Sequence, residues 1–254
     1  MDWLTERPIA HRGLHTMKGV RGESNGTHRP ENAPSAFGAA VARGYAIECD
    51  LQPTRDGDVV VFHDRTLDRM TGRAGEVREH DAAHLAYIHL ANGSEGIPRL
   101  SELLELVDGR VPLVLELKGE GADPDAFVRS VANALNGYDG PVAAMSFLSP
   151  ITDRFAEHMP DVPRGLTAEG DDRAFEAHTR AMKSGDLHFI SYDVNALPCR
   201  LTREARENGV PVICWTVQTP EQVALSRAHA DQMTFEGFLP DAKAERPATL
   251  SILS

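Results

Sequence analysis

The sequence predicts a (β/α)8 barrel of the TIM type, with a small insertion after one strand. Strand-length apolar runs alternate with amphipathic segments, which indicates βαβ units and a parallel sheet. Roughly eight such repeats in 254 residues match the ~250 residues that this barrel needs. A doubly wound open sheet is the alternative, but no GxGxxG follows the first strand. No segment reads as a linker, so we expect residues 1–254 to form a single domain.

The strand candidates are the short apolar runs, often rich in β-branched residues and bounded by turn residues. In chain order they are 8–13, 46–52, 58–64, 111–118, 141–147, 163–167, 187–193, 210–217 and 230–235. The helix candidates between them have apolar residues at helical spacing, and they are 31–44, 99–109, 123–137, 197–209 and 219–229. Residues 65–98 interrupt the alternation, and we expect a polar insertion without a clear helix or strand of its own.

Composition narrows the class of protein. The chain is 41% apolar and 25% charged, as in ordinary globular proteins, and its net charge of −12 disfavours a nucleic acid or an anionic membrane as partner. No apolar run approaches the ~20 residues that span a bilayer, so no stable membrane insertion is expected. The N-terminus lacks a secretory signal pattern, and Cys49, Cys199 and Cys214 suggest reduced thiols, so we expect a cytoplasmic protein.

Carboxylates interrupt runs that should be buried. Residues i and i+2 of a strand share a face, so Glu48 and Asp50 point together while Cys49 points into the packing behind them. Glu116 and Lys118 repeat this geometry on a later strand. Converging carboxylates with oxygen donors alone suit Mg²⁺ or Ca²⁺. The alternative is a structural network in which these acids pair with Arg or Lys.

Two histidines differ from the rest because each ends a strand beside a charged neighbour. His11 precedes Arg12 and His63 precedes Asp64, at the strand ends where barrel active sites lie. Such a pair suits general acid–base work, with Arg12 and Lys118 available to an anion. This predicts metal-assisted chemistry on an anionic substrate, either phosphoryl transfer or proton abstraction beside a carboxylate. Ordinary surface or core roles are expected for His15, His28, His80, His84, His89, His158, His178, His188 and His229.

The ordered motifs resemble those of the glycerophosphodiester phosphodiesterase family. They are HRG (11–13), PEN (30–32), ECD (48–50), HD (63–64), ELK (116–118) and WTV (215–217). Within the insertion, TLDRMTG (66–72), Gly75, Val77 and IPRL (97–100) also match in order. Each motif alone is common, but the ordered set from Pro8 to about Thr234 is specific.

The resemblance implies a barrel that holds one divalent cation, Mg²⁺ or Ca²⁺. The positions that match the family's metal ligands are Glu48, Asp50 and Glu116, and those that match its general acid and base are His11 and His63. It further implies that Arg12 contacts the phosphate and that Lys118 lies near it. Supporting roles fall to Glu31, Asn32 and Asp64, and Trp215 would either line the pocket or pack in the core.

The implied reaction is hydrolysis of a small-molecule glycerophosphodiester to glycerol 3-phosphate and an alcohol. One histidine would deprotonate the glycerol 2-hydroxyl, which attacks phosphorus, while the other protonates the leaving alcohol. A cyclic phosphate would form, and water would open it. A non-catalytic phosphodiester-binding module and a phospholipase-like enzyme on intact lipids are the alternatives. The head group, the choice of metal, the identity of the base and the oligomeric state stay open.

The chain departs from the family pattern after the last strand. Thr234 and Phe235 stand where the family usually has Thr-Asp followed by Pro. We expect Phe235 to alter the C-terminal rim on the side of the leaving alcohol. We also expect the polar loop 14–29 to overhang the mouth and tune the choice of substrate.

Overall fold

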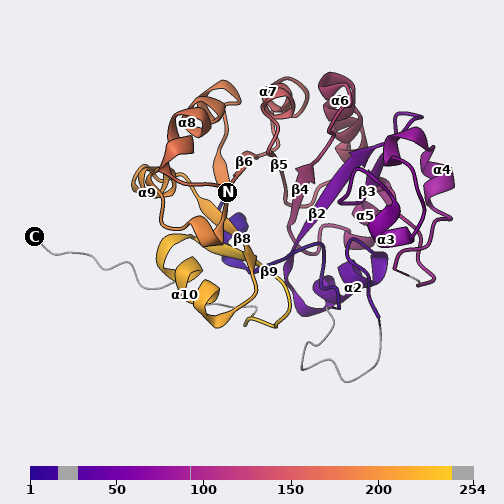
Figure 1. The fold of residues 1–254 in the computed structure, drawn as a ribbon, viewed down its shortest axis with the longest axis horizontal. Helices are drawn as coiled ribbons and strands as arrows, with labels where there is room; N and C mark the ends of the chain where they lie inside the picture. Colours follow the sequence, from indigo (N-terminus) through magenta and orange to yellow (C-terminus); the bar gives the residue numbers. More distant parts are fainter. Residues whose placement is uncertain (17–27, 92, 242–254) are drawn as a thin grey trace, which may run out of the picture.

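A closed barrel of eight parallel strands forms the centre of the computed structural model, which describes residues 1–16, 28–91 and 93–241 (Figure 1). In chain order the barrel strands are β1 (Ile9–Ala10), β2 (Ala46–Pro53), β4 (Leu113–Leu117), β5 (Val142–Ser146), β6 (Arg164–Ala168), β7 (Phe189–Asp193), β8 (Val212–Val217) and β9 (Gln232–Phe235). Strand β1 pairs in parallel with both β2 and β9, which closes the sheet. The predicted barrel is therefore confirmed, and the open sheet is wrong.

One predicted strand is not part of the barrel. Residues of the run 58–64 form β3 (Val59–Val61), which pairs antiparallel with the end of β2. The pairing places Val61 opposite Leu51 and Val59 opposite Pro53. Gly57 provides the left-handed residue of the tight turn between them, with φ 80°. Because the hairpin folds back along β2, the residues after β3 return toward Asp50, and the amide of Phe62 donates to the Asp50 carbonyl (2.9 Å).

Helices surround the barrel (Figure 1). The longer ones are α2 (Pro34–Arg43), α5 (Leu100–Val107), α6 (Pro124–Leu135), α7 (Ser149–His158), α8 (Phe175–Ser184), α9 (Arg200–Glu207) and α10 (Pro220–His229). Short 3₁₀ turns precede α8 and α9, and these are η2 (Asp172–Ala174) and η3 (Val194–Ala196). Side-chain caps explain two of the starts, since Asp123 accepts from the amide of Asp125 and Thr219 from that of Gln222. Helices α7 and α8 were not among the sequence candidates.

The insertion 65–98 has structure of its own, contrary to expectation. It contains α3 (Asp68–Thr71), η1 (Val77–Glu79) and α4 (Ala82–Leu85). Its buried side chains form an apolar cluster with Val60 and Phe62, which flank the end of β3. The separate cluster explains how a polar segment stays ordered, because its buried apolar side chains pack against one another. It also fixes the backbone immediately before His63.

Apolar side chains fill the amino-terminal end of the barrel interior. Helix α1 (Trp3–Glu6) contributes Leu4, which packs in one cluster with Ile9, Val114 and Phe189. Further along the same strands the inward positions become charged, at Glu48 and Asp50 on β2 and at Glu116 on β4. The larger core lies between the barrel and the helices and includes Cys49, as the alternation in β2 predicts. The buried carboxylates of the barrel interior therefore lie at its carboxyl end, where active sites of such barrels are found.

None of the helices in the described part of the chain is both long and apolar enough to cross a membrane.

Candidate active site

Three buried carboxylates converge inside the carboxyl end of the barrel. Glu48, Asp50 and Glu116 each offer an oxygen, and these oxygens lie within 4.8 Å of one another. Strand register explains the convergence, because Asp50 pairs directly with Glu116 across β2 and β4, and Glu48 lies two residues before Asp50 on the same face. The structure thus brings together the three residues that the sequence analysis assigned to a metal.

Two cationic side chains compensate part of this charge. The ammonium of Lys118 lies 3.2 Å from Oδ1 of Asp50 and also contacts Glu116, while Nε of Arg12 lies 3.3 Å from Oδ2 of Asp50. Although burial opposes it, Lys118 and Arg12 hold the pKa of Asp50 well below its usual range. Asn32 adds a hydrogen bond of 2.9 Å to the same carboxylate. The ionic network that was the alternative reading therefore exists, and it centres on Asp50.

Glu48 is not satisfied by this network. Its Oε2 accepts from the backbone amide of Arg12 (2.9 Å), but its Oε1 is buried without a hydrogen-bond partner among the described residues. Burial and the neighbouring carboxylates raise the pKa of Glu48 well above its usual range, and burial raises the pKa of Glu116 to about 7. An unpartnered buried carboxylate oxygen is costly. The three carboxylates therefore fit a hard divalent cation, which would take the free oxygen of Glu48 and compensate the charge.

A left-handed turn after β1 brings the HRG motif to this cluster. Arg12 and Gly13 have φ of 52° and 76°, and a Cβ on Gly13 would lie 2.9 Å from Cδ1 of Phe37. A larger residue at position 13 would therefore meet both backbone strain and a packed ring. The turn directs the guanidinium of Arg12 between Asp50 and Glu31, whose Oε1 accepts from Nη1 (2.8 Å).

His63 lies on the insertion side of the cluster. Its Nδ1 lies 2.6 Å from Oδ1 of Asp64, and burial lowers the pKa of its imidazole. Arg69 from α3 donates to Asp64 (2.6 Å) and through its other nitrogens to Glu31 (2.6 Å). One guanidinium therefore fixes the two carboxylates that support His63 and Arg12. Arg69 was not among the predicted site residues, although it lies inside the motif TLDRMTG (66–72).

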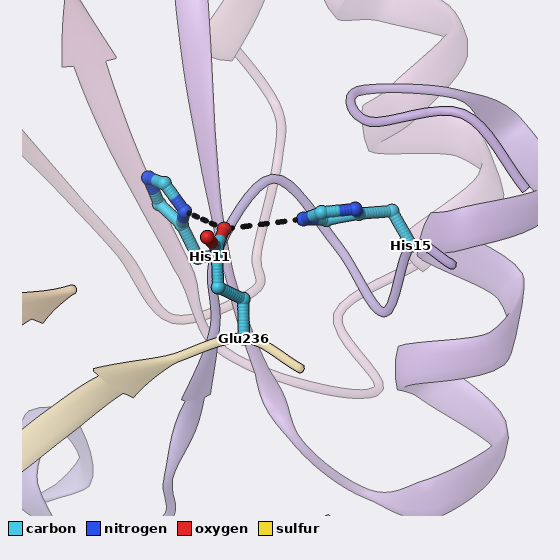
Figure 2. Close-up of side chains that lie close together, drawn as sticks. All are labelled: His11, His15 and Glu236. Atoms are coloured by element: carbon cyan, nitrogen blue, oxygen red, sulfur yellow. Dashed lines mark hydrogen bonds and ion pairs between the residues drawn. The ribbon is translucent and has the colours of Figure 1, made fainter. Parts of the chain in front are cut away.

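His11 directly follows β1, at the point where β1 and β9 pair and close the barrel. Its Nδ1 lies 2.6 Å from Oε2 of Glu236, and its Nε2 faces Oε2 of Glu48 at 3.9 Å. Figure 2 shows Glu236 between His11 and His15, whose Nε2 lies 3.3 Å from the same carboxylate oxygen. Burial lowers the pKa of His11. Although burial opposes it, the hydrogen bonds from the two imidazoles hold the pKa of Glu236 well below its usual range.

The ending of β9 corrects two expectations. Phe235 is buried on the outer side of the barrel, where its ring packs against Tyr45 (centroids 4.9 Å apart), so it does not form the rim. Glu236, the next residue, faces the site instead and contacts His11. His15, which the sequence analysis placed among the ordinary histidines, lies in the same cluster. The alternation of sides along a strand could have identified Glu236, because it lies two residues after the inward-facing Thr234.

An aromatic pair lies beside Lys118. The Nζ atom of Lys118 is 5.8 Å from the ring centroid of Phe147, and Phe147 packs edge-on against Trp215 at 5.5 Å. The indole of Trp215 donates to the Ser191 carbonyl (3.2 Å), which fixes its orientation. Trp215 is thus half-buried at the carboxyl end of β8. The loop 14–29, predicted to overhang the mouth, lies largely outside the described residues.

Residues 21–239 match the model of the glycerophosphoryl diester phosphodiesterase family. The chain belongs to this family. The matched segment begins after the HRG motif, which the structure independently places beside the ECD and ELK carboxylates. The resemblance drawn from the ordered motifs is confirmed, as is the assignment to the phosphoric diester hydrolases.

Relatives cover nearly the whole chain. The YhdW protein of Bacillus subtilis is 27% identical over 246 residues, which span 92% of this chain and 93% of that protein. A glycerophosphodiester phosphodiesterase of Caldanaerobacter subterraneus is 28% identical and covers 80% of this chain and 86% of its own length. Among solved structures, an Oleispira antarctica phosphodiesterase in complex with the product sn-glycerol-3-phosphate superimposes with a TM-score of 0.76. At 22% identity it covers 92% of this chain and 93% of that one, which shows the shared barrel fold.

Proposed function

We propose that the protein hydrolyses glycerophosphodiesters to glycerol 3-phosphate and an alcohol, with one Mg²⁺ or Ca²⁺ held by Glu48, Asp50 and Glu116. One observation carries the proposal: two imidazoles flank the carboxylate cluster, and each has its Nδ1 bound to a separate carboxylate at 2.6 Å. That bond leaves the Nε2 of each ring available for proton transfer. The similar Oleispira antarctica phosphodiesterase, solved in complex with its product sn-glycerol-3-phosphate, supports the glycerol phosphate half of the substrate.

Each residue of the site has a proposed role that follows from its position. When bound, the cation would lower the pKa of the glycerol 2-hydroxyl and neutralise phosphate charge. One of His11 and His63 removes the proton from that hydroxyl, which attacks phosphorus, and the other protonates the leaving alcohol. Arg12 and Lys118 bind the phosphate oxygens, since both cations already lie on the cluster. The same two imidazoles then serve the hydrolysis of the cyclic phosphate with their roles exchanged.

Supporting residues hold this arrangement. Asn32 fixes Asp50, Asp64 orients His63, and Glu31 orients Arg12. Trp215 with Phe147 would line the pocket beside Lys118.

The test is the release of glycerol 3-phosphate from a panel of glycerophosphodiesters after EDTA treatment, then with Mg²⁺ or Ca²⁺ restored. We expect turnover that depends on the added metal and a loss of 10²-fold or more in His63→Ala. His89→Ala, at an exposed histidine of the insertion, is the matched control and should retain wild-type turnover. Near-normal activity of His63→Ala would refute the assignment. Faster hydrolysis of vesicle phospholipid than of any soluble diester would instead favour the phospholipase alternative.

A further inference from the structure

A second cluster of metal-ligating atoms lies where β9 meets the turn after β1. One ring nitrogen each of His11 and His15 and one carboxylate oxygen of Glu236 all lie within 4.8 Å of one another. In Figure 2 the two imidazoles approach the same carboxylate from opposite sides. His11 and His15 come from the turn after β1 and Glu236 from the residue after β9, so the pairing of β1 with β9 assembles the cluster.

Oε2 is the carboxylate oxygen of Glu236 that lies next to both histidines. Its other oxygen, Oε1, accepts a hydrogen bond from the side-chain amide of Gln218, which fixes the plane of the carboxylate. Within the described ranges, its ion pairs are those with His11 and His15. All three side chains of the cluster are partly exposed, at 14%, 10% and 14%, so an ion from solvent can reach them.

The donor atoms distinguish this cluster from the three carboxylates beside it. Two imidazole nitrogens and one carboxylate oxygen suit a borderline ion such as Zn²⁺, whereas an all-oxygen set suits Mg²⁺ or Ca²⁺. Zn–N and Zn–O bonds of about 2.0–2.2 Å place donor atoms roughly 3.3–3.5 Å apart in a tetrahedral site. The His15–Glu236 separation is already 3.3 Å, and the His11–Glu236 separation of 2.6 Å needs to open by less than an ångström.

We propose that His11, His15 and Glu236 form a Zn²⁺ site, and that Zn²⁺ bound there inhibits the enzyme. A neutral imidazole has one ring nitrogen with a proton and one with a lone pair. If the lone pair of His11 Nδ1 binds Zn²⁺, the proton of the ring must reside on Nε2. Nε2 is the atom that faces Glu48 (3.9 Å), and in this tautomer it has no lone pair with which to accept a proton. The inhibitory effect rests on the proposed role of His11, whereas binding of the ion does not.

The test measures binding and turnover in parallel. The full-length protein is dialysed against a series of Zn²⁺ concentrations in the presence of saturating Mg²⁺, and bound zinc per chain is determined by mass spectrometry of the metal. We expect one Zn²⁺ per chain, and inhibition over the same concentration range. His15→Gln keeps a donor to Glu236 but lacks the imidazole ligand, and it should weaken both binding and inhibition at least tenfold. His89→Ala, which alters a histidine outside the cluster, should match the wild type.

Three outcomes would overturn the proposal. Zinc affinity unchanged in His15→Gln would place the ion elsewhere. If increasing Mg²⁺ displaced zinc to the same extent from the wild type and from His15→Gln, the zinc would be assigned to the carboxylates of Glu48, Asp50 and Glu116. Full turnover at saturating bound zinc would refute the inhibition. If the enzyme shows no turnover at all, the binding measurement still decides the site, and the proposed function fails separately. Unchanged thermal melting of His15→Gln excludes misfolding as the cause of any loss.

Discussion

Asp50 and Glu116 are directly paired residues on neighbouring parallel strands, and the ammonium of Lys118 contacts both carboxylates. The register of β2 and β4 places the Cα atoms of Asp50 and Glu116 opposite each other, so the backbone sets the spacing between the two carboxylates. Lys118, two residues after Glu116, balances the charge from the same strand. Strands β2 and β4, with the residue after β4, thus provide both the carboxylates and an ammonium that balances part of their charge.

The first prediction concerns the metal. Glu116→Gln keeps the size of the side chain but removes one of the three proposed anionic ligands, so we expect 10- to 100-fold weaker activation by Mg²⁺ or Ca²⁺, with partial recovery at high metal concentration. Activity titrated with each metal after EDTA treatment measures this. Glu105→Gln, at an exposed glutamate of α5, is the control. An unchanged metal requirement in Glu116→Gln would exclude Glu116 as a ligand.

The second prediction separates the acid from the base. A leaving group that needs no proton, such as 4-nitrophenolate, makes the general acid dispensable. We expect one of His11→Ala and His63→Ala to recover activity on glycerophospho-4-nitrophenol, while the other stays reduced by about 10²–10⁴-fold on both substrates. The variant that recovers lacks the acid. Equal losses for both variants on both substrates would contradict a division of roles between the histidines.

The third prediction concerns the bond between His63 and Asp64. Asp64→Asn keeps the shape of the side chain but removes the charge that fixes the Nδ1–H tautomer of His63. We expect kcat to fall roughly 10- to 100-fold with little change in KM, since Asp64 acts through His63. Steady-state kinetics on a soluble diester measures both constants. A change in KM alone would indicate that Asp64 contacts the substrate instead. Asp68→Asn, in the adjacent helix α3, is the control.

The fourth prediction concerns the thiols. Cys49, Cys199 and Cys214 are all free and buried. Burial raises the pKa of Cys49 well above its usual range and that of Cys214 to about 12. Because all three thiols are buried, and because the thiolate is the reactive form, none of the three should react with a disulfide reagent in the native protein at pH 8. All three should react in guanidinium chloride. Rapid reaction of any native thiol would show that its segment opens readily.

Periodicity and motif order were enough to predict the carboxylate cluster and to single out His11 and His63 beside it. They placed His63 at the right end of the barrel for the wrong reason. Residues 58–64 were expected to form a strand of the barrel, whereas β3 turns back antiparallel along β2 and returns His63 to the cluster. A run of three valines has the same composition in either orientation, so the direction of pairing is not visible in it.

Helices α7 and α8 were missed because their apolar patterns are short. The core takes Ile151, Thr152 and Phe155 from α7, and only Phe175 and Ala181 from α8. The role of Glu236 was hidden for a different reason, since the analysis compared the family's aspartate with the residue at the same position, Phe235. A comparison of equivalent positions in two sequences does not show on which side of the strand a residue lies. Contact with His11 depends on that side, and here Glu236 rather than Phe235 faces the site.

The contact between His11 and Glu236 joins the first barrel strand to the last. It forms only when β1 has paired with β9, where the amide of His11 donates to the carbonyl of Phe235 (3.0 Å). A refolding chain in which these two strands are still apart therefore has the carboxylates of β2 and β4 but only one oriented imidazole. With the proposed role of His11, return of turnover during refolding would report this final pairing, whereas helical circular dichroism would recover with the surrounding helices. Turnover would then measure whether the first and last strands of the barrel have paired.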